Sequence, residues 1–118
     1  MSDPNWVTGV TQCKYLAIDG DFMYVTQGDN TISRIQISTQ VLTLNWISGL
    51  SSPTGIVING DYMYVGNQGT NIITKIQIST ATIVDANWAT GLSSPNSLVI
   101  SGGYIYMLQM DSRIQLVE

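Results

Sequence analysis

Carboxylates beside two tight turns are the side chains of this sequence best suited to hold a cation. Asp19 and Asp21 flank one glycine, and Asp61 follows another at the matching place. The run Gln27-Gly28-Asp29-Asn30 also offers oxygen ligands, but it lacks the regular ligand spacing of an EF-hand calcium loop. Aspartate beside glycine is also ordinary hairpin-turn chemistry. We favour the turn interpretation and predict neither a metal site nor a cofactor.

Nucleophilic and acid–base catalysis have little support in this sequence. Its 118 residues include no histidine, which removes the usual general base, the commonest metal ligand and any Ser-His triad. Cys13 is the single cysteine, so it has no partner for an intrachain disulfide and no histidine to activate it. We predict that Cys13 is a small core or loop residue, that no residue is catalytic, and that the chain is not an enzyme.

Three tryptophans stand at matching places in the sequence. Trp6, Trp46 and Trp88 each follow an asparagine and precede a glycine by three residues. Aromatic rings present apolar area with a polar edge, so one interpretation makes them platforms on which sugars stack. The other makes them packing residues that seal the outer edge of a repeated unit. We favour packing, because every such unit needs a large residue there.

The tryptophans belong to a longer repeat. Tyr62-Met63-Tyr64-Val65 matches 22–25 and 104–107, and Ser51-Ser52-Pro53 matches 93–95. Ile35-Gln36-Ile37 matches 76–78 and, in the third copy, Ile114-Gln115-Leu116, where the preceding loop looks shorter. A period of about 40 residues made of short apolar runs is the length of one four-stranded propeller blade.

Each repeat divides into four strand-like runs. In the middle repeat these are 54–59, 62–66, 72–78 and 81–91, and the turn signals Gly60-Asp61 and Ser79-Thr80 lie between them. Val, Ile, Thr and Tyr dominate the runs, as pleated and half-buried surfaces favour. The first runs are apolar on both faces, which is typical of strands between two neighbouring sheets, and no window has helical periodicity. We predict an all-β fold, a β-propeller with four-stranded blades.

Three motifs of the middle repeat follow one another in a fixed order. They are Pro53-Thr54-Gly55-Ile56, then Gly60-Asp61-Tyr62-Met63-Tyr64-Val65, then Asn71-Ile72-Ile73-Thr74-Lys75-Ile76. This order resembles the NHL family of propeller repeats, although Thr26, Gly66 and Leu108 replace the aspartate that many NHL repeats carry after Tyr-Val. The resemblance implies a propeller, often with six blades, and no particular function.

The repeats are offset within the sequence. A fourth strand at 5–9 comes first, two full blades follow at 14–49 and 54–91, and an incomplete blade occupies 96–117. Three blades do not close a ring, because known rings hold about four to eight. We therefore expect a head-to-tail homodimer with six blades, in which strand 5–9 of one copy completes the last blade of the other. A fragment of a longer propeller, a larger ring and an artificial half-propeller are the alternatives.

Charge and composition narrow the choice of partner. Charged residues make up 10% of the chain, and its four basic residues are scattered, so we predict no nucleic-acid partner. No apolar run has the length of a transmembrane helix, and the first residues lack the basic and apolar regions of a signal peptide. We predict no membrane association and favour a cytoplasmic location.

Polar loops supply the remaining candidate site residues. Lys14, Thr54 and Asn96 begin the innermost strands and would surround the mouth of a central channel, with Asn30 and Asn71 on loops of the same face. Amides and hydroxyls suit hydrogen bonding to a neutral glycan or to a protein. We predict a non-catalytic binding or scaffold module. The alternatives are an enzyme with a site in the central channel and a half-propeller without a ligand.

Overall fold

Eleven strands make up the part of the chain that the computed structural model describes, residues 6–109 and 113–117. In chain order they are β1 (Cys13–Asp19), β2 (Phe22–Gln27), β3 (Thr31–Gln36), β4 (Val41–Ile47), β5 (Pro53–Asn59), β6 (Tyr62–Asn67), β7 (Ile72–Gln77), β8 (Thr82–Ala89), β9 (Pro95–Ser101), β10 (Tyr104–Gln109) and β11 (Ile114–Leu116). The all-β fold expected from the sequence is confirmed. Within these residues, no helix is long and apolar enough to span a membrane.

The strands form three antiparallel sheets, one for each repeat of the sequence. The first sheet has the order β1-β2-β3-β4, the second has β5-β6-β7-β8, and the third has β11-β10-β9. Within each sheet, a strand pairs with its neighbours in the chain, because short connections join antiparallel strands directly. Within the described residues, the third sheet therefore lacks a counterpart of β4 and β8.

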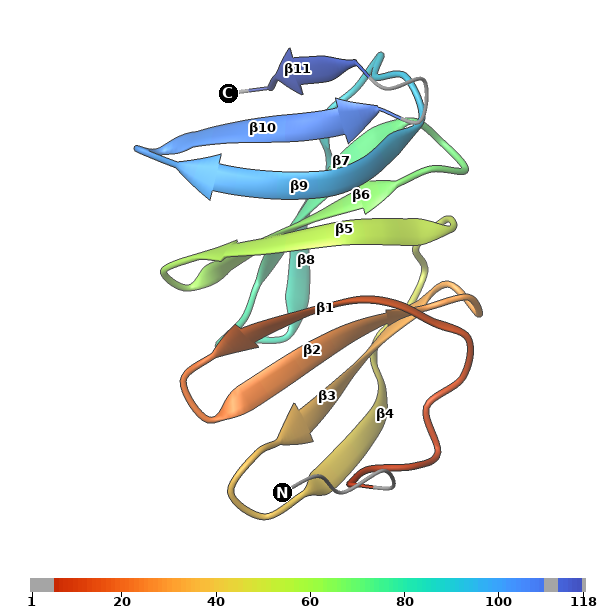
Figure 1. Ribbon diagram of the computed structural model, residues 1–118, viewed down its shortest axis with the longest axis vertical. Helices are drawn as coiled ribbons and strands as arrows, with labels where there is room; N and C mark the ends of the chain where they lie inside the picture. The colour runs from red at the N-terminus through yellow and green to blue at the C-terminus, as the bar shows by residue number, and fades with distance from the viewer. Residues whose placement is uncertain (1–5, 110–112, 118) are drawn as a thin grey trace.

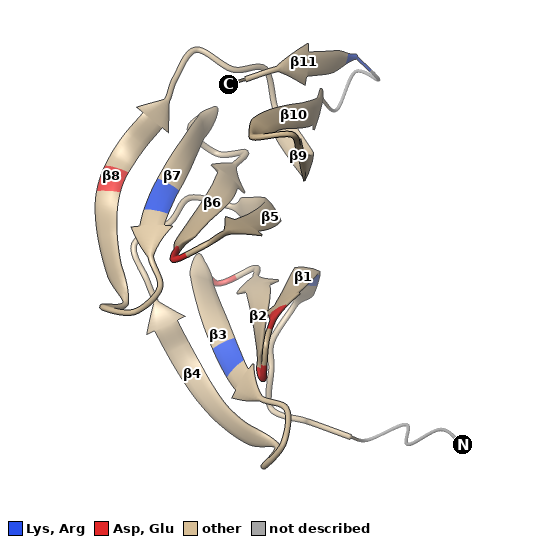
Figure 2. Cartoon of the chain, turned by 90° about the vertical axis from the view of Figure 1, so that its left-hand side faces the viewer, with Lys and Arg blue, Asp and Glu red and all other residues tan. Residues whose placement is uncertain are grey.

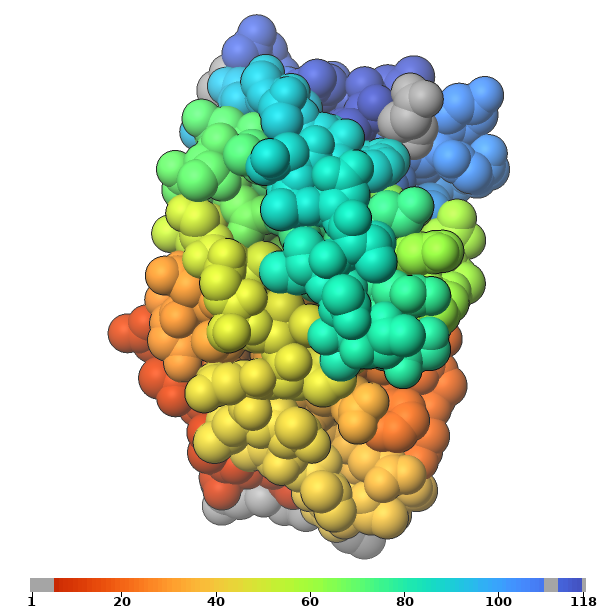
Figure 3. Space-filling model, turned by 180° about the vertical axis from the view of Figure 1, so that it is seen from behind, coloured from red at the N-terminus to blue at the C-terminus, as the bar shows by residue number. Residues whose placement is uncertain are grey.

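The three sheets stack face to face along the long axis of the molecule (Figure 1). Their first strands, β1, β5 and β9, lie on one side of the stack, and β4 and β8 lie on the opposite side (Figure 2). Figure 3 shows that outer side, where β4 and its linker appear in yellow and β8 in teal. Each sheet thus runs from an inner strand to an outer strand in chain order.

The connections repeat as faithfully as the strands. Gly20 and Gly60, in the turns after β1 and β5, have φ angles of 60° and 63°, a left-handed conformation that glycine adopts without a steric penalty. The linkers that enter the three sheets place Gln12, Ser52 and Ser94 at φ angles of 49°, 49° and 45°. Few residues other than glycine adopt such angles. A common linker conformation therefore delivers the chain to each inner strand.

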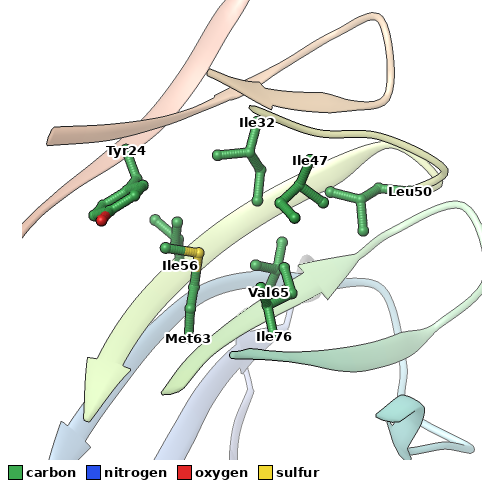
Figure 4. Packing of buried hydrophobic residues seen from close by; sticks show 8 residues of the cluster. All are labelled: Tyr24, Ile32, Ile47, Leu50, Ile56, Met63, Val65 and Ile76. Atoms are coloured by element: carbon green, nitrogen blue, oxygen red, sulfur yellow. The ribbon is translucent and has the colours of Figure 1, made fainter. Parts of the chain in front are cut away.

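The first core cluster lies between the first and second sheets. Figure 4 shows its eight buried residues: Tyr24, Ile32, Ile47 and Leu50 from the first repeat, and Ile56, Met63, Val65 and Ile76 from the second. Residues on one side of each strand thus face the next sheet, and residues on the other side face the preceding one, because side chains alternate along a strand. We call these two sides of a sheet its forward face and its rear face.

The second core cluster joins the second and third sheets in the same way. Its buried residues are Val57, Ile73 and Leu92 on the forward side, and Leu98, Ile105 and Met107 on the rear side of the third sheet. The backbones approach closely at Gly55, where an added Cβ would lie 2.3 Å from the Asn96 carbonyl oxygen. Tyr15 occupies the matching position of the first sheet. The two interfaces between sheets therefore bury equivalent positions, but at the inner strand one has Tyr15 where the other has Gly55.

The strand pairing of the third sheet corrects one expectation. Val117 donates a backbone hydrogen bond to Ile105, so Val117 takes the place that Ile35 and Ile76 hold in the other sheets. Ile114, which the sequence aligns with Ile35, lies opposite Leu108 instead. The loop is therefore not about three residues shorter, as the alignment of Ile114 with Ile35 suggested. Gln109 faces Arg113 as Gln27 faces Thr31, so three residues separate the paired ends in both sheets, against four between Asn67 and Ile72 in the second sheet.

The sequence predicts a fourth strand over 5–9, and residue 5 lies outside the described residues. From Trp6 to Gly9 the described backbone pairs with no strand. The Gln40 amide nitrogen donates a hydrogen bond of 2.7 Å to the Trp6 carbonyl oxygen. The segment thus lies beside the first sheet.

Candidate functional site

Asn30 and Asn71, two of the predicted ligand-binding residues, hold the loops of neighbouring repeats together. The Asn30 side-chain oxygen accepts the Ser52 N–H at 2.8 Å, and the Asn71 oxygen accepts the Ser94 N–H at 2.9 Å. Their carbonyl oxygens accept the N–H groups of Leu50 and Leu92, both at 3.2 Å. The side-chain oxygen of each asparagine therefore already accepts a hydrogen bond within the chain, and the side chains are exposed.

Thr54, predicted to lie at a channel mouth, belongs to a row of hydroxyl contacts between neighbouring sheets. The Thr26 hydroxyl donates to the Thr54 carbonyl oxygen at 3.1 Å, and the Thr54 hydroxyl donates to the Pro95 carbonyl oxygen at 2.9 Å. Thr54 is 4% exposed. These bonds satisfy buried carbonyl groups that water does not reach, and they tie three consecutive sheets together.

Asn96 and Lys14, the other two channel-mouth candidates, differ from Thr54 in their exposure. The Tyr15 hydroxyl donates to the Asn96 side-chain oxygen at 2.5 Å, which joins the first sheet to the third past the second. Asn96 is half-buried, and Lys14 is exposed. Of the three predicted positions, Lys14 and Asn96 thus reach solvent at the inner edge of the stack.

A buried amide ends the second strand of every sheet. Gln27 donates to the Thr31 hydroxyl at 2.7 Å, and its oxygen lies 3.4 Å from the Thr11 N–H. Asn67 repeats this arrangement with the Thr74 hydroxyl at 2.8 Å and the Ser51 N–H at 3.1 Å. In the first two sheets, these amides fasten the incoming linker to the sheet.

Gln109 departs from that pattern. It is 8% exposed, and its amide nitrogen donates to the Gln115 side-chain oxygen at 3.1 Å. Its own side-chain oxygen has no hydrogen-bond partner among the described residues. A buried acceptor without a donor destabilises the folded state by about 1–3 kcal/mol. The third sheet therefore lacks, at Gln109, the hydrogen bond that fastens the linker to the sheet at Gln27 and Asn67.

Trp46 and Trp88, two of the three possible aromatic platforms, contact tyrosine rings of their own sheets in a tilted arrangement. The ring centroids of Tyr24 and Trp46 are 5.0 Å apart, and those of Tyr64 and Trp88 are 4.7 Å apart. Both tryptophans are half-buried and pack against the two core clusters. The geometry matches the packing interpretation for these two rings. Trp6 is half-buried beside the first sheet.

A cation lies over the aromatic rings in the first two sheets. The Arg34 guanidinium is 4.5 Å from the centroid of the Phe22 ring, and the Lys75 ammonium is 4.3 Å from that of Tyr62. Both bases lie in the middle of a third strand (Figure 2). Leu116 occupies this position in the third sheet, opposite Tyr106. The third sheet thus carries an apolar side chain where the others carry a charge.

Asp21 and Asp61 join two turns of the same sheet. Asp21 accepts the Ser38 hydroxyl at 2.5 Å and the Ser38 N–H at 2.9 Å, and Asp61 accepts the same groups of Ser79 at 2.6 Å and 2.9 Å. The hydroxyl bonds are the main reason that the pKa of each carboxyl lies below its ordinary value of 3.8. The described ranges contain no group of three possible metal-ligating side chains.

The two ends of the stack expose apolar faces. The forward face of the third sheet consists of Val99, Tyr106, Leu108, Ile114 and Leu116, all of which are exposed. The rear face of the first sheet consists of Leu16, Ile18, Met23, Val25 and Ile35. Leu16 and Ile18 are exposed there, and Trp6, Val7 and Val10 line a cavity with Leu16, Met23, Val25 and Ile35. Within the described residues, neither end face has a sheet packed against it.

The largest cavity described, of about 460 Å³, lies at the open edge of the third sheet. Its lining residues are Trp88, Ala89, Thr90, Leu92, Gln115 and Val117. The cavity at the corresponding edge of the second sheet measures about 170 Å³, and Ala86 and Asn87 of β8 form part of its wall. The larger volume therefore lies where the described part of the chain supplies no fourth strand to the third sheet.

Several of these contacts carry no recognisable signal in the sequence. The Tyr15–Asn96 hydrogen bond joins residues two repeats apart, and neither residue type recurs at its repeat position. The role of Gln27 and Asn67 had a weak signal, since an amide ends the second strand in each repeat. An amide recurring inside an apolar unit favours a structural hydrogen bond.

The chain is similar to one family of repeats in its sequence and to designed proteins in its structure. A family model described as the LVIVD repeat, a propeller-type repeat, matches residues 52–74. The computationally designed protein Ika4 superposes with a TM-score of 0.69 and 13% identity, over 88% of this chain and 64% of Ika4. The computationally designed Ika8 superposes with a TM-score of 0.68 and 14% identity, over 89% of this chain and 32% of Ika8. Both are designed propellers. The chain is built from β-propeller repeats.

The resemblance to a propeller repeat and the propeller architecture are thus confirmed, and each sheet corresponds to one blade. At 13% and 14% identity, the likeness to the two designed propellers shows the fold alone. The chain spans 64% of the length of Ika4 and 32% of that of Ika8. No curated protein matches the chain. The assignment to NHL repeats, the six-bladed ring and the nature of the ligand stay predictions.

Proposed function

We propose that this propeller is a non-catalytic module that closes into a six-bladed ring with a second copy of itself and presents its polar loops to a protein or a neutral glycan. The observation that carries the proposal is the nature of the two end faces. The forward face of the third sheet and the rear face of the first sheet are the same two sides that pack together twice inside the chain.

Residues at the same repeat position differ in exposure: they are buried between two sheets but exposed on the two end faces. This difference supports a partner that covers both end faces. Ile114 is 75% exposed, whereas Ile32 and Ile73, at the same position of the other sheets, are fully buried. Leu16 is 59% exposed, whereas Ile56 and Leu98 are each 7% exposed. Burial of such side chains is favourable in proportion to the apolar area removed from water. Contiguous apolar faces of this kind mark interaction surfaces.

A second copy is the occupant that fits both faces at once. A forward face packs on a rear face inside the chain, and each copy offers one free face of each kind. Joining unlike faces is a head-to-tail contact, which either closes into a ring or grows into a filament. Two copies of three sheets give six blades, which is within the range of about four to eight seen in closed propellers.

Binding is favoured over catalysis by the chemistry of the inner and loop residues. The sequence has no histidine, and the pKa values of Asp21 and Asp61 are lowered by hydrogen bonds to serines instead of raised towards neutrality. The exposed groups at the inner edge include Lys14, with the amides of Asn30 and Asn71 on the loops. These groups suit hydrogen bonding to neutral polar ligands.

Light scattering coupled to size exclusion tests the assembly. The expected mass is twice the 12.9 kDa of the chain. Ile114→Glu and Leu16→Glu each place a charge on one end face and should give monomers. Val84→Glu alters an exposed residue of the outer strand β8 and should leave the mass doubled. A folded wild-type monomer at micromolar concentration, or a mass of three or more chains, would contradict the homodimer.

A neutral-glycan array tests ligand presentation. Binding by the assembled ring that Lys14→Ala weakens, with an unchanged mass and melting temperature, would support a site at the inner edge. Thr43→Ala, which alters an exposed residue of the outer strand β4, serves as the control and should bind normally. A ring that binds no glycan and no defined protein probe would overturn the ligand-presenting part of the proposal.

A further inference from the structure

The third sheet has an open outer edge among the described residues, and the segment before the first sheet has the features of the strand that would cover it. We propose that residues 6–9 of one copy complete the third sheet of a second copy, with the Trp6 ring against the exposed Tyr106 ring of that second copy. This inference rests on the proposed self-assembly and names the residues that are exchanged.

The backbone that enters the first sheet is already arranged as if it came from a preceding blade. Gly9 and Gln12 have φ angles of 98° and 49°, and Gly49 and Ser52 have 81° and 49°. The Gly28 N–H donates to the Gln12 carbonyl oxygen at 3.0 Å, as the Gln68 N–H donates to Ser52 at 3.1 Å. The chain at 9–12 therefore follows the path of a linker between two blades.

The side chains before this linker also lie where a fourth strand would leave them. Trp6, Val7 and Val10 line one cavity with Met23, Val25 and Ile35 on the rear face of the first sheet. The matching residues of the next repeat, Trp46, Ile47 and Leu50, pack with Met63, Val65 and Ile76. The segment thus needs no large displacement to meet the forward face of an incoming third sheet.

Tyr106 holds the same repeat position as Tyr24 and Tyr64, but no tryptophan ring contacts it among the described residues. Tyr24 and Tyr64 each have a tryptophan ring within 5.0 Å, whereas Tyr106 is exposed and has no ring contact among the described residues. Trp6 carries the same Asn-Trp motif as Trp46 and Trp88. The cavity of about 460 Å³ beside Gln115 and Val117 lies at the edge that the segment would cover.

The repeat also fixes which residues should face each other. Ile32 pairs with Ile47, and Ile73 pairs with Ala89. Val7 holds the place of Ile47 and Ala89, and Ile114 holds the place of Ile32 and Ile73. Val7 of one copy should therefore lie opposite Ile114 of the other. Directly opposed residues of neighbouring strands have Cβ atoms about 4.5–5.5 Å apart, and a disulfide requires little adjustment from there.

Disulfide trapping tests this pairing. In a Cys13→Ser background, chains carrying Val7→Cys are mixed with chains carrying Ile114→Cys and oxidised. The expected product is a disulfide-linked pair that contains one chain of each kind. Thr8→Cys replaces Val7→Cys in the matched control. In the exchanged strand the side chain at position 8 would point to the other face, so this mixture should give little linked product.

The outcomes separate the two proposals. A doubled mass without the Val7–Ile114 disulfide, or equal linkage in the Thr8 control, overturns strand exchange and leaves self-assembly intact. A monomeric wild-type chain overturns both.

A second test needs no added cysteine. Trp6→Ala and Tyr106→Ala should each raise the dissociation constant of the dimer, and Trp6→Phe should restore part of the loss. In the double variant the two effects should fall short of additivity by roughly 2- to 10-fold in that constant, as contacting aromatic rings do. Fully additive effects would show that the two rings do not meet.

Discussion

The ring of Trp88 lies 4.7 Å from the ring of Tyr64 at an interplanar angle of 55°, and Trp46 holds nearly the same relation to Tyr24, at 5.0 Å and 49°. In each pair the tyrosine comes from the second strand of a sheet and the tryptophan from the fourth, so the contact spans the strand between them. The pair therefore holds the outer strand against the rest of its sheet.

Removal of one of these rings should destabilise the fold. Trp46→Ala should lower the free energy of unfolding by about 3 kcal/mol, the lower end of the range for a buried tryptophan, because the ring is half-buried. Trp46→Phe should lose less, since a ring remains on Tyr24. Urea denaturation followed by circular dichroism gives both values. A Trp46→Ala chain as stable as the wild type would favour the sugar platform over packing.

A side chain at Gly55 should force the second and third sheets apart. In Gly55→Ala the new Cβ would lie 2.3 Å from the Asn96 carbonyl oxygen and 2.7 Å from the Leu98 nitrogen, both backbone atoms. Overpacking of this kind typically lowers the free energy of unfolding by about 1–3 kcal/mol. Gly69→Ala is the matched control, because its nearest neighbour is the Ser51 hydroxyl, which can rotate away. Equal losses in the two variants would argue against close packing at Gly55.

The hydrogen bond between Tyr15 and Asn96 should couple the first sheet to the third. Tyr15→Phe removes the donor and should lower the free energy of unfolding by about 1 kcal/mol, the usual net worth of such a bond. Asn96→Ala should lower it by a similar amount. A double-mutant cycle measured by thermal unfolding should show that the two losses do not add. Additive losses would mean that the bond does not form in solution.

Acid should weaken the hydrogen bonds that Asp21 and Asp61 accept from Ser38 and Ser79. Hydrogen bonds from Ser38 and Ser79 hold the pKa of these carboxyls below 3.8, the value expected when the chain is unfolded. Because the folded pKa is the lower one, the stabilisation is complete above pH 3.8 and disappears as the pH falls through the folded pKa. The wild type should therefore be more stable than Ser38→Ala/Ser79→Ala at neutral pH, and the difference should shrink in acid. Melting temperatures across pH test this, and a constant difference would contradict it.

Much of the architecture follows from local patterns in the sequence. The four-stranded unit is visible because turn residues such as Gly60 and Ser79 bound short β-branched and aromatic runs, and because Tyr64 and Met63 recur at fixed places. Alternation along these runs also assigns the two faces of each sheet, since the side-chain period of a strand is two. Local chemistry therefore predicts the blade.

The strand register of the third blade and the contacts between blades did not follow from those patterns. Ile114 aligns with Ile35 by residue type, yet the pairing of Gln109 with Arg113 sets a register that turns Ile114 towards the opposite face. Register depends on the connection between strands as well as on the apolar pattern. Thr54 likewise looked like a channel-mouth hydroxyl, because nothing in the sequence indicates that the Pro95 carbonyl oxygen lies 2.9 Å from it.

The unpartnered oxygen of Gln109 has a consequence for the order in which the molecule opens. Where Gln27 and Asn67 accept linker N–H groups, deuterium should enter slowly, because exchange requires the joint to break. The third sheet has no such bond at Gln109 among the described residues, so its amides should exchange first in the isolated chain. The three similar repeats would then form a gradient of protection, highest in the middle blade, which is covered on both faces, and lowest in the third.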